Sequence, residues 1–294
     1  MARTFSRKTF LRGAAGATGA VAAGVLLGPV RAQGLPGESD WKALGTAIDG
    51  RVILPSDDQY AAAKSVFNTG FGGSTPAAVI TVKSTSDVQK AVAFAASNNV
   101  QVAPRSGGHS YIGASAANGA IMIDLRPLSG EVAYDDGSGL VTVPTAADLQ
   151  SVQTALAAHG RSIPTGSCPS VGAAGLTLGG LGIDSRAHGL TCDMLASASV
   201  VLPSGDEVTA SAGEHDDLYW ALRGGGGGNF GVTTSLMFRT FPVADQDLVK
   251  LQFPFPATAQ VIVGWHNWLT KADASMWSMV DITSGPDGQG AASC

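Results

Sequence analysis

Glycine residues concentrate in one segment of this sequence, where their spacing could serve to bind a phosphate group. Backbone N–H groups can approach a pyrophosphate closely where no Cβ intervenes. The glycines concerned are Gly166, Gly172, Gly175, Gly179, Gly180 and Gly182. Neither familiar phosphate cradle fits, because no G-x-G-x-x-G register with a later acidic residue exists and no lysine follows a glycine loop. On composition alone, a pair of tight turns packed against a strand explains the segment equally well.

Five histidines and three cysteines supply the other nucleophilic or metal-binding groups. Neither an HExxH pattern nor a CxxC pair is present, so we predict no metal site. Taken out of context, His109 is most simply a hydrogen-bonded loop histidine. Cys168, Cys192 and Cys294 are too few and too scattered for a disulfide framework. We expect Cys168, inside the glycine segment, to be a small packed residue.

The elements that would position these residues follow from hydrophobic periodicity. A β-branched run at 78–82 predicts a strand, and Ser86 with Gln89 predicts the start of a helix through a capping box. A strand at 100–103 completes a β-α-β unit, and its return loop is the segment 104–110, which contains His109.

Further strands and helices are expected on both sides of the glycine segment. Strands are predicted at 51–54, 121–125, 132–135, 140–143, 198–202, 207–210 and 231–241, and helices at 40–48, from 145 to 160 and at 216–222. After residue 243, a strand at 248–253, a helix at 257–271 and a strand at 276–283 indicate a new α+β layer. Residues 284–290 are turn material, and we expect no closing element behind them.

Composition and charge narrow the class of protein. Of the 294 residues, 45% are hydrophobic and 14% charged, which is typical of a globular chain. The formal net charge is −5 and no basic run exists outside the extreme N-terminus, so we expect no nucleic-acid partner. We also expect no membrane association once the N-terminal segment is removed.

Residues 1–32 have the features of an export signal. Four basic residues precede a weakly apolar Ala/Gly-rich stretch at 14–27, and Val30-Arg31-Ala32 forms a small-residue cleavage signal. The segment 6–12 resembles the twin-arginine signal of bacteria, except that Lys8 stands where the second arginine is expected. We predict export to the periplasm or the medium by either route. The alternative is a basic tail on a cytosolic protein.

Four segments together resemble one family, the berberine-bridge-enzyme-like FAD-linked oxidases of the vanillyl-alcohol-oxidase or p-cresol-methylhydroxylase (PCMH) superfamily. Arg105-Ser106-Gly107-Gly108-His109-Ser110 is similar to the flavin-attachment loop of that family, and Gly189-Leu190-Thr191-Cys192-Asp193 resembles its second attachment segment. The glycine segment 166–182 resembles its pyrophosphate loop. Residues 217–224 with Asn229-Phe230-Gly231-Val232 are similar to its late glycine signature. The four motifs occur in the order of the family, between about Pro76 and Pro242.

The resemblance implies FAD attached to the chain at two points. The imidazole of His109 would add to the methyl group at flavin C8, and the thiolate of Cys192 would add to flavin C6. An inert buried Cys192, or a disulfide between Cys192 and Cys168, is the alternative and would exclude the thioether. The other cofactor-binding residues implied are Arg105, Ser106, Gly107, Gly108, Ser110, Gly166, Ser167, Gly172, Gly175, Gly179, Gly180, Gly182, Asp193 and Val232. Arg105 could instead be a structural salt-bridge former.

The implied fold is α+β: a PCMH-type FAD-binding domain of two β-rich subdomains, followed by an incomplete α+β substrate domain. We expect the export signal at 1–32, the N-terminal part of the FAD domain at 33–74, its main part at 75–242 and the start of the substrate domain at 243–294. Family members continue further and carry their proton-abstracting residue in the later half. A C-terminal truncation is therefore expected, and no catalytic residue can be assigned.

The predicted function is that of an exported FAD-dependent oxidoreductase. A small-molecule alcohol, sugar or similar carbon centre would lose hydride to the covalent flavin, with oxygen as a compatible acceptor. One alternative is a catalytically silent flavin- or ligand-binding remnant, and another is a structural exported domain that would be colourless. The sequence does not determine the substrate, the acceptor or the oligomeric state.

Overall fold

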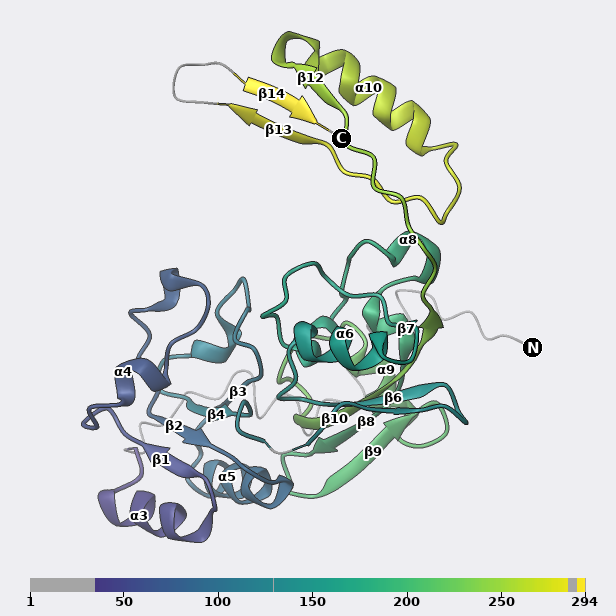
Figure 1. The fold of residues 1–294 in the computed structure, drawn as a ribbon. Helices are drawn as coiled ribbons and strands as arrows, with labels where there is room; N and C mark the ends of the chain where they lie inside the picture. Colours follow the sequence, from purple (N-terminus) through teal and green to yellow (C-terminus); the bar gives the residue numbers. More distant parts are fainter. Residues whose placement is uncertain (1–34, 129, 285–289, 294) are drawn as a thin grey trace, which may run out of the picture. The chain divides into compact units, whose positions relative to one another are not determined.

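The computed structural model describes residues 35–128, 130–284 and 290–293. Gly37–Cys294 form one compact unit, distinct from Met1–Pro36. Figure 1 shows the fold, with colours that follow the chain from purple at the N-terminal end to yellow at the C-terminal end. The predicted export signal at 1–32 lies outside the described residues.

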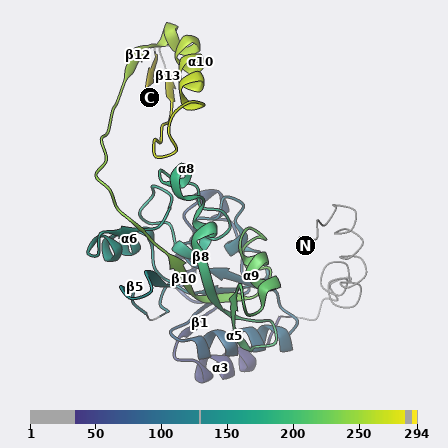
Figure 2. The same ribbon diagram turned by 90° about the vertical axis from the view of Figure 1, so that its right-hand side faces the viewer.

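The first sheet is mostly parallel and has the strand order β1-β2-β4-β3. Its strands are β1 (Arg51–Ile53), β2 (Ala78–Thr81), β4 (Ile121–Asp124) and β3 (Val102–Arg105). The helices α3 (Glu38–Ala47) and α5 (Thr85–Ser97) lie together on one side of this sheet (Figures 1 and 2). Their apolar stripes pack on the branched side chains of β2 and β4, which forms the core of the first subdomain.

The second sheet is antiparallel and has the order β5-β6-β10-β8-β9. Its strands are β5 (Ala133–Asp135), β6 (Leu140–Pro144), β10 (Val232–Arg239), β8 (Leu195–Val201) and β9 (Glu207–Ser211). The helices α6 (Leu149–Ala157) and α9 (Asp216–Leu222) supply buried side chains to its core. A short pair, β7 (Arg161–Ser162) with β11 (Phe241–Pro242), follows. The predicted α+β architecture of two β-rich subdomains is confirmed.

Residues after 243 form a third, smaller sheet with the order β12-β14-β13. Its elements are β12 (Gln252–Pro254), the 3-10 turn η4 (Phe255–Ala257), α10 (Thr258–Leu269), β13 (Asp281–Ser284) and β14 (Gly290–Ser293). The expectation that no element closes this layer was wrong, because β14 pairs with both other strands. The Gly-Ala-Ala-Ser run of β14 has little intrinsic strand preference, so its sequence pattern does not reveal it.

Several element boundaries differ from the prediction for local reasons. The side chain of Ser84, rather than Ser86, caps α5 by accepting a hydrogen bond of 3.2 Å from the N–H of Asp87. Helix α6 begins at Leu149 behind Asp148, which caps it through the N–H of Ser151 at 2.8 Å. The pattern also missed short pieces, namely α4 (Tyr60–Ala63), η1 (Thr69–Phe71), η2 (Ala114–Ala116), α7 (Ala173–Leu176), α8 (Ser185–His188) and η3 (Thr191–Met194).

Strand β3 ends on Arg105, which is only 1% exposed and lies in a buried ion cluster. Its guanidinium reaches Asp124 at the end of β4 at 2.6 Å, and Asp124 also binds Arg126 at 2.9 Å. Burial by itself raises the pKa of Asp124, but hydrogen bonds from Arg126 and Arg105 outweigh it and hold that pKa below its ordinary value. Arg105 also donates to the carbonyl of Ser65 at 2.9 Å. The cluster therefore fixes the point at which the chain leaves the first sheet.

We expect Asp124→Asn to lower the free energy of unfolding by about 3–5 kcal/mol, because Arg105 would be left buried without its counter-charge. Urea denaturation at pH 7 measures this. Asp136→Asn is the control, since that side chain is 83% exposed and its replacement should change stability by about 0.5 kcal/mol or less. Equal midpoints for the Asp124 variant and the unmodified chain would contradict a stabilising cluster.

The same cluster predicts a dependence of stability on pH. A carboxylate whose pKa is depressed in the folded chain contributes stability above its unfolded pKa of about 4, and this contribution is lost as the pH falls. The stability difference between the unmodified chain and Asp124→Asn should therefore shrink below about pH 4. A difference that grows on acidification would contradict the assignment.

Candidate functional site

The two predicted glycine loops meet backbone to backbone at Gly107 and Gly172. A Cβ on either glycine would lie closer than 3.0 Å to the backbone of the other loop. Both loops are held from behind by the segment that enters α6. Ser106 donates to the carbonyl of Thr145 at 2.7 Å, and the N–H of Ala173 donates to the carbonyl of Ala147 at 2.9 Å. The contact requires the absence of side chains at both positions.

This contact brings His109 beside the start of the second loop. The Nε2 of His109 lies 3.3 Å from the Oγ of Ser170, and the same Oγ lies 3.5 Å from the Sγ of Cys168. The ring of Phe67 stacks on the imidazole, with centroids 4.0 Å apart and an interplanar angle of 18°. One hydroxyl therefore connects an imidazole and a thiol that are 59 residues apart in the chain, as their numbers show.

The environments of the two cysteines differ from what their predicted roles suggest. Cys168 was expected to be packed, but it is exposed, while Cys192, the predicted attachment residue, is buried. Both are free thiols, so the alternative disulfide between them is not formed. Residues 167–170 at the tip of this loop are all exposed, and a small residue in a tight turn can be exposed as easily as buried. The sulfur that lies in one hydrogen-bonded chain with His109 is that of Cys168.

Cys192 sits in a structural turn between the glycine segment and β8. Its N–H donates to the carbonyl of Gly179 at 3.1 Å, and the side chain is 7% exposed. Burial raises the pKa of the Cys192 thiol, the charge of Asp193 adds to this, and Arg223 opposes it. A thiol with a raised pKa is a poor nucleophile at neutral pH. Burial therefore argues against Cys192 as the attachment residue.

Some of the remaining predicted glycines are required by close backbone contacts or by a positive φ, whereas others have free space around the Cα. Gly180 and Gly182 allow close approach, since a Cβ would collide with Thr191 and with the carbonyl of Thr165 respectively. Gly108 adopts a φ of 74°, which favours glycine. A Cβ on Gly175 or Gly179 would meet nothing within 4 Å, and one on Gly166 only ordinary contacts.

The polar and apolar members of the predicted set are mostly engaged within the chain. Arg105 is committed to Asp124, and Ser110 accepts from the N–H of Ala114 at 3.1 Å. Asp193 accepts from the N–H of Leu190 at 2.8 Å. Val232 is 3% exposed in the first core, which leaves only its backbone for a ligand. Ser167 is exposed at the loop tip.

Ser170 and Phe67 contact His109 but were not selected from the sequence. Ser170 stands inside the motif Gly166–Gly172, so the motif itself could have pointed to this residue. Phe67 lies in an irregular stretch 42 residues before His109, where no pattern points to it. Its N–H donates to the carbonyl of Gly108 at 3.1 Å, which fixes the stacked pair.

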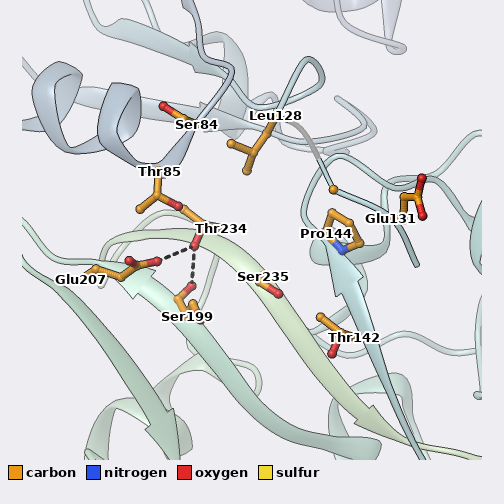
Figure 3. Close-up of a pocket in the computed structure, with 11 residues that line it drawn as sticks. Ser84, Thr85, Leu128, Glu131, Thr142, Pro144, Ser199, Glu207, Thr234 and Ser235 are labelled. Atoms are coloured by element: carbon orange, nitrogen blue, oxygen red, sulfur yellow. Dashed lines mark hydrogen bonds between the residues drawn. The ribbon is translucent and has the colours of Figure 1, made fainter. Parts of the chain in front are cut away.

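Two hollows lie near the sheets. One of about 460 Å³ runs along the free edge of β3 and is bounded by Phe71, Pro104, Asn118, Gly228 and Asn229. It is next to the loop that follows β3 and to the late glycine motif. The other, of about 330 Å³, is lined mainly by hydroxyl side chains from α5, β6, β8 and β10 (Figure 3). Within it Thr234 lies 3.3 Å from Glu207, and no predicted site residue lines it.

The described residues contain neither a metal-binding cluster nor a membrane-spanning helix. Over the ranges that the structure describes, no group of three or more His, Cys, Asp or Glu side chains is arranged to hold a metal ion. No helix in that part of the chain is long and apolar enough to cross a bilayer.

Comparison with known proteins identifies the family. Residues 76–211 match the family model of an FAD binding domain. The xylooligosaccharide oxidase of Thermothelomyces thermophilus is 38% identical over 203 residues, which are 66% of this chain and 40% of that protein. The uncharacterised FAD-linked oxidoreductase YgaK of Bacillus subtilis is 31% identical over 242 residues, 81% of this chain and 53% of that protein.

Solved structures agree. The 6-hydroxy-D-nicotine oxidase of Arthrobacter nicotinovorans superposes with a TM-score of 0.78 at 26% identity, over 84% of this chain and 55% of that one. The glucooligosaccharide oxidase of Acremonium strictum, which is described with a 6-S-cysteinyl, 8α-N1-histidyl FAD, gives 0.75 at 28% identity, over 86% and 54%.

The fold and the loop pair thus define a PCMH-type FAD-binding domain. The chain's FAD binding domain and its relatives are those of the berberine-bridge-enzyme-like FAD-linked oxidases, the family that the sequence motifs resemble. The chain spans 53% of the length of YgaK and 55% of that of the nicotine oxidase, so about half of these relatives.

We expect Gly172→Ala to abolish most flavin binding, because the new Cβ would separate the two loops that carry His109 and Cys168. The flavin content per chain, measured by absorbance after purification, should fall about tenfold or more, as for a binding free energy reduced by about 1.4 kcal/mol or more. Gly213→Ala is the matched control, because a Cβ there meets nothing within 4 Å. Full flavin content in the Gly172 variant would contradict the importance of the contact.

Proposed function

We propose that this chain binds FAD at the junction of the loops 105–110 and 166–172, and attaches it covalently through His109 and Cys168. The observation that carries the proposal is the contact chain from the His109 imidazole through Ser170 to the Cys168 thiol, with distances of 3.3 and 3.5 Å. The sequence predicted Cys192 as the second attachment residue. The exposure of Cys168 and the burial of Cys192 favour Cys168 instead.

The residues present fit a flavin dinucleotide. Gly107 and Gly172 form a surface without side chains on which a pyrophosphate could approach backbone N–H groups. The hollow along β3 is lined by Pro104 and Ile112, on either side of the first loop, and is large enough, at about 460 Å³, for the nucleotide end. An exposed thiol and a stacked imidazole supply the two nucleophiles.

FAD, when bound, would supply the two-electron acceptor for a hydride from an alcohol or sugar carbon. The residues of this chain hold and orient it: the glycine contact sets the distance between the loops, and Phe67 restricts the plane of the imidazole. We propose a sugar-like small molecule as substrate, since relatives are named as xylooligosaccharide, carbohydrate and chitooligosaccharide oxidases. Oxygen is the proposed acceptor.

We also propose a division of the chain into an FAD domain and the start of a substrate domain. Residues 33–74 and 75–242 would form the FAD domain, and residues 243–294 would begin the substrate domain. The third sheet, which begins after residue 243, supports the second boundary, and the pairing of β1 with β2 supports placing 33–74 in the same domain as 75–242. Export directed by residues 1–32 is likewise proposed, on the basic region and small-residue cleavage signal of that segment.

Covalent attachment can be tested by denaturing the purified protein in acid and recording the visible spectrum of the polypeptide. Yellow colour should remain with the chain. His109→Ala and Cys168→Ala should each retain flavin through one bond, whereas the double variant should release it. Cys192→Ala should retain flavin as the unmodified chain does. Loss of one attachment in the Cys192 variant, with Cys168→Ala unaffected, would return the assignment to Cys192.

Oxidase activity can be tested by mixing the flavin-loaded chain with xylo-, cello- and chitooligosaccharides without oxygen. We expect one of these sugars to bleach the flavin band. When air is admitted, the band should return and hydrogen peroxide should be formed. A chain that binds flavin but is not bleached by any of them would be a flavin-binding protein without this activity.

A further inference from the structure

We propose that Ser170 is a positioning residue that prepares both attachment residues at once, by holding a proton on Nε2 of His109 and donating its own proton to the sulfur of Cys168. The inference rests on the proposed function, because it concerns how the two proposed attachment residues become reactive. It assigns a role to a residue that neither the motif nor the fold singles out.

The geometry leaves little freedom at the hydroxyl. The Oγ of Ser170 lies 3.3 Å from His109 Nε2 and 3.5 Å from Cys168 Sγ, both within hydrogen-bond range because sulfur is a large atom. A serine hydroxyl has one hydrogen to donate and accepts through its lone pairs. Since it has a single hydrogen, it donates to at most one of its two neighbours and accepts from the other or from both.

Only one of the possible arrangements prepares both groups, because a hydroxyl that accepts from both neighbours leaves the proton on the thiol. If Nε2–H donates to Ser170 and Ser170 donates to the sulfur, Nδ1 carries a free lone pair and a thiolate on Cys168 is stabilised. In the reverse direction the thiol keeps its proton and Nε2 accepts, so the neutral imidazole carries its proton on Nδ1. Both groups would then be poor nucleophiles. The first direction is the one that attachment requires.

The surrounding contacts hold the imidazole and the hydroxyl in place. Phe67 stacks on the imidazole at 4.0 Å, which restricts rotation of the ring and leaves Nε2 facing the hydroxyl. The Gly107–Gly172 contact fixes the loop that carries Ser170 against the loop that carries His109. It follows that Nδ1 of His109 is the nitrogen that forms the bond to the flavin methyl group.

The chemistry balances with dioxygen as the oxidant. Each attachment breaks one C–H bond of the flavin and one N–H or S–H bond of the chain, and forms one C–N or C–S bond. Two protons and two electrons are released at each attachment, and dioxygen takes them up as hydrogen peroxide. Ser170 is unchanged at the end, since it only directs where the protons lie before the bonds form.

The test uses the full chain produced in a riboflavin-starved host, to which FAD is added in air. Attachment is followed by mass spectrometry of the His109 and Cys168 peptides. We expect Ser170→Ala to slow bond formation at both residues by about fivefold or more, the factor that the net value of one hydrogen bond provides. Ser170→Thr keeps the hydroxyl and should restore the rate. Ser204→Ala is the control, an exposed turn serine whose hydroxyl donates to Asp206 at 2.8 Å, far along the chain from both attachment loops.

A second measurement needs no flavin and leaves Ser170 unchanged. The ¹⁵N spectrum of flavin-free protein reports which ring nitrogen of His109 carries the proton, and His109→Gln identifies its signals. We expect the neutral imidazole to be protonated on Nε2. Protonation on Nδ1 would overturn the proposal, and so would an unchanged rate in Ser170→Ala or a slow rate in Ser170→Thr.

These results separate the inference from the proposed function. If the unmodified chain never binds flavin, the proposed function fails, while the tautomer of His109 and the rate at which iodoacetamide alkylates Cys168 still test the role of Ser170. Alkylation should be about fivefold slower in Ser170→Ala than in the unmodified chain, as for the loss of one hydrogen bond to the thiolate. If flavin attaches normally in Ser170→Ala, only the inference fails.

Discussion

The close approach of Gly107 to Gly172 is the constraint on which the rest of the site depends. Two loops from different subdomains can touch through their backbones only where neither carries a side chain. The first loop leaves the parallel sheet after β3, and the second leads from β7 toward β8 of the antiparallel sheet. The contact therefore joins the two cores at one point and places an imidazole, a hydroxyl and a thiol in sequence.

Polar contacts around the loops fix the position of the Gly107–Gly172 contact. The buried pair of Arg105 and Asp124 fixes the last residue of β3, directly before the loop, and Ser106 is tied to the carbonyl of Thr145. Thr145 in turn donates to Thr233 at the start of β10 at 2.8 Å. A continuous set of short polar contacts thus runs from the first sheet through the loop to the second sheet.

Much of the fold follows from sequence, because its helices and strands have strong apolar periodicity. The pattern gave α9 and most of the strands with errors of a few residues, while β14 was missed because Gly and Ala carry little strand signal. The flavin loop was predicted through its motif. The exposure of Cys168 and the burial of Cys192 were not predicted, since a resemblance between short segments does not contain burial. The contact of Phe67 with His109 is tertiary and leaves no local pattern.

We propose that one flavin is bonded to both His109 of the first loop and Cys168 of the second. Proteolysis of the flavin-loaded chain, followed by mass spectrometry of the yellow fragments, tests this most directly. We predict a single cross-linked species in which one flavin joins the peptide of His109 to the peptide of Cys168. A flavin joined to the peptide of Cys192, or a yellow fragment that contains neither His109 nor Cys168, would contradict the account.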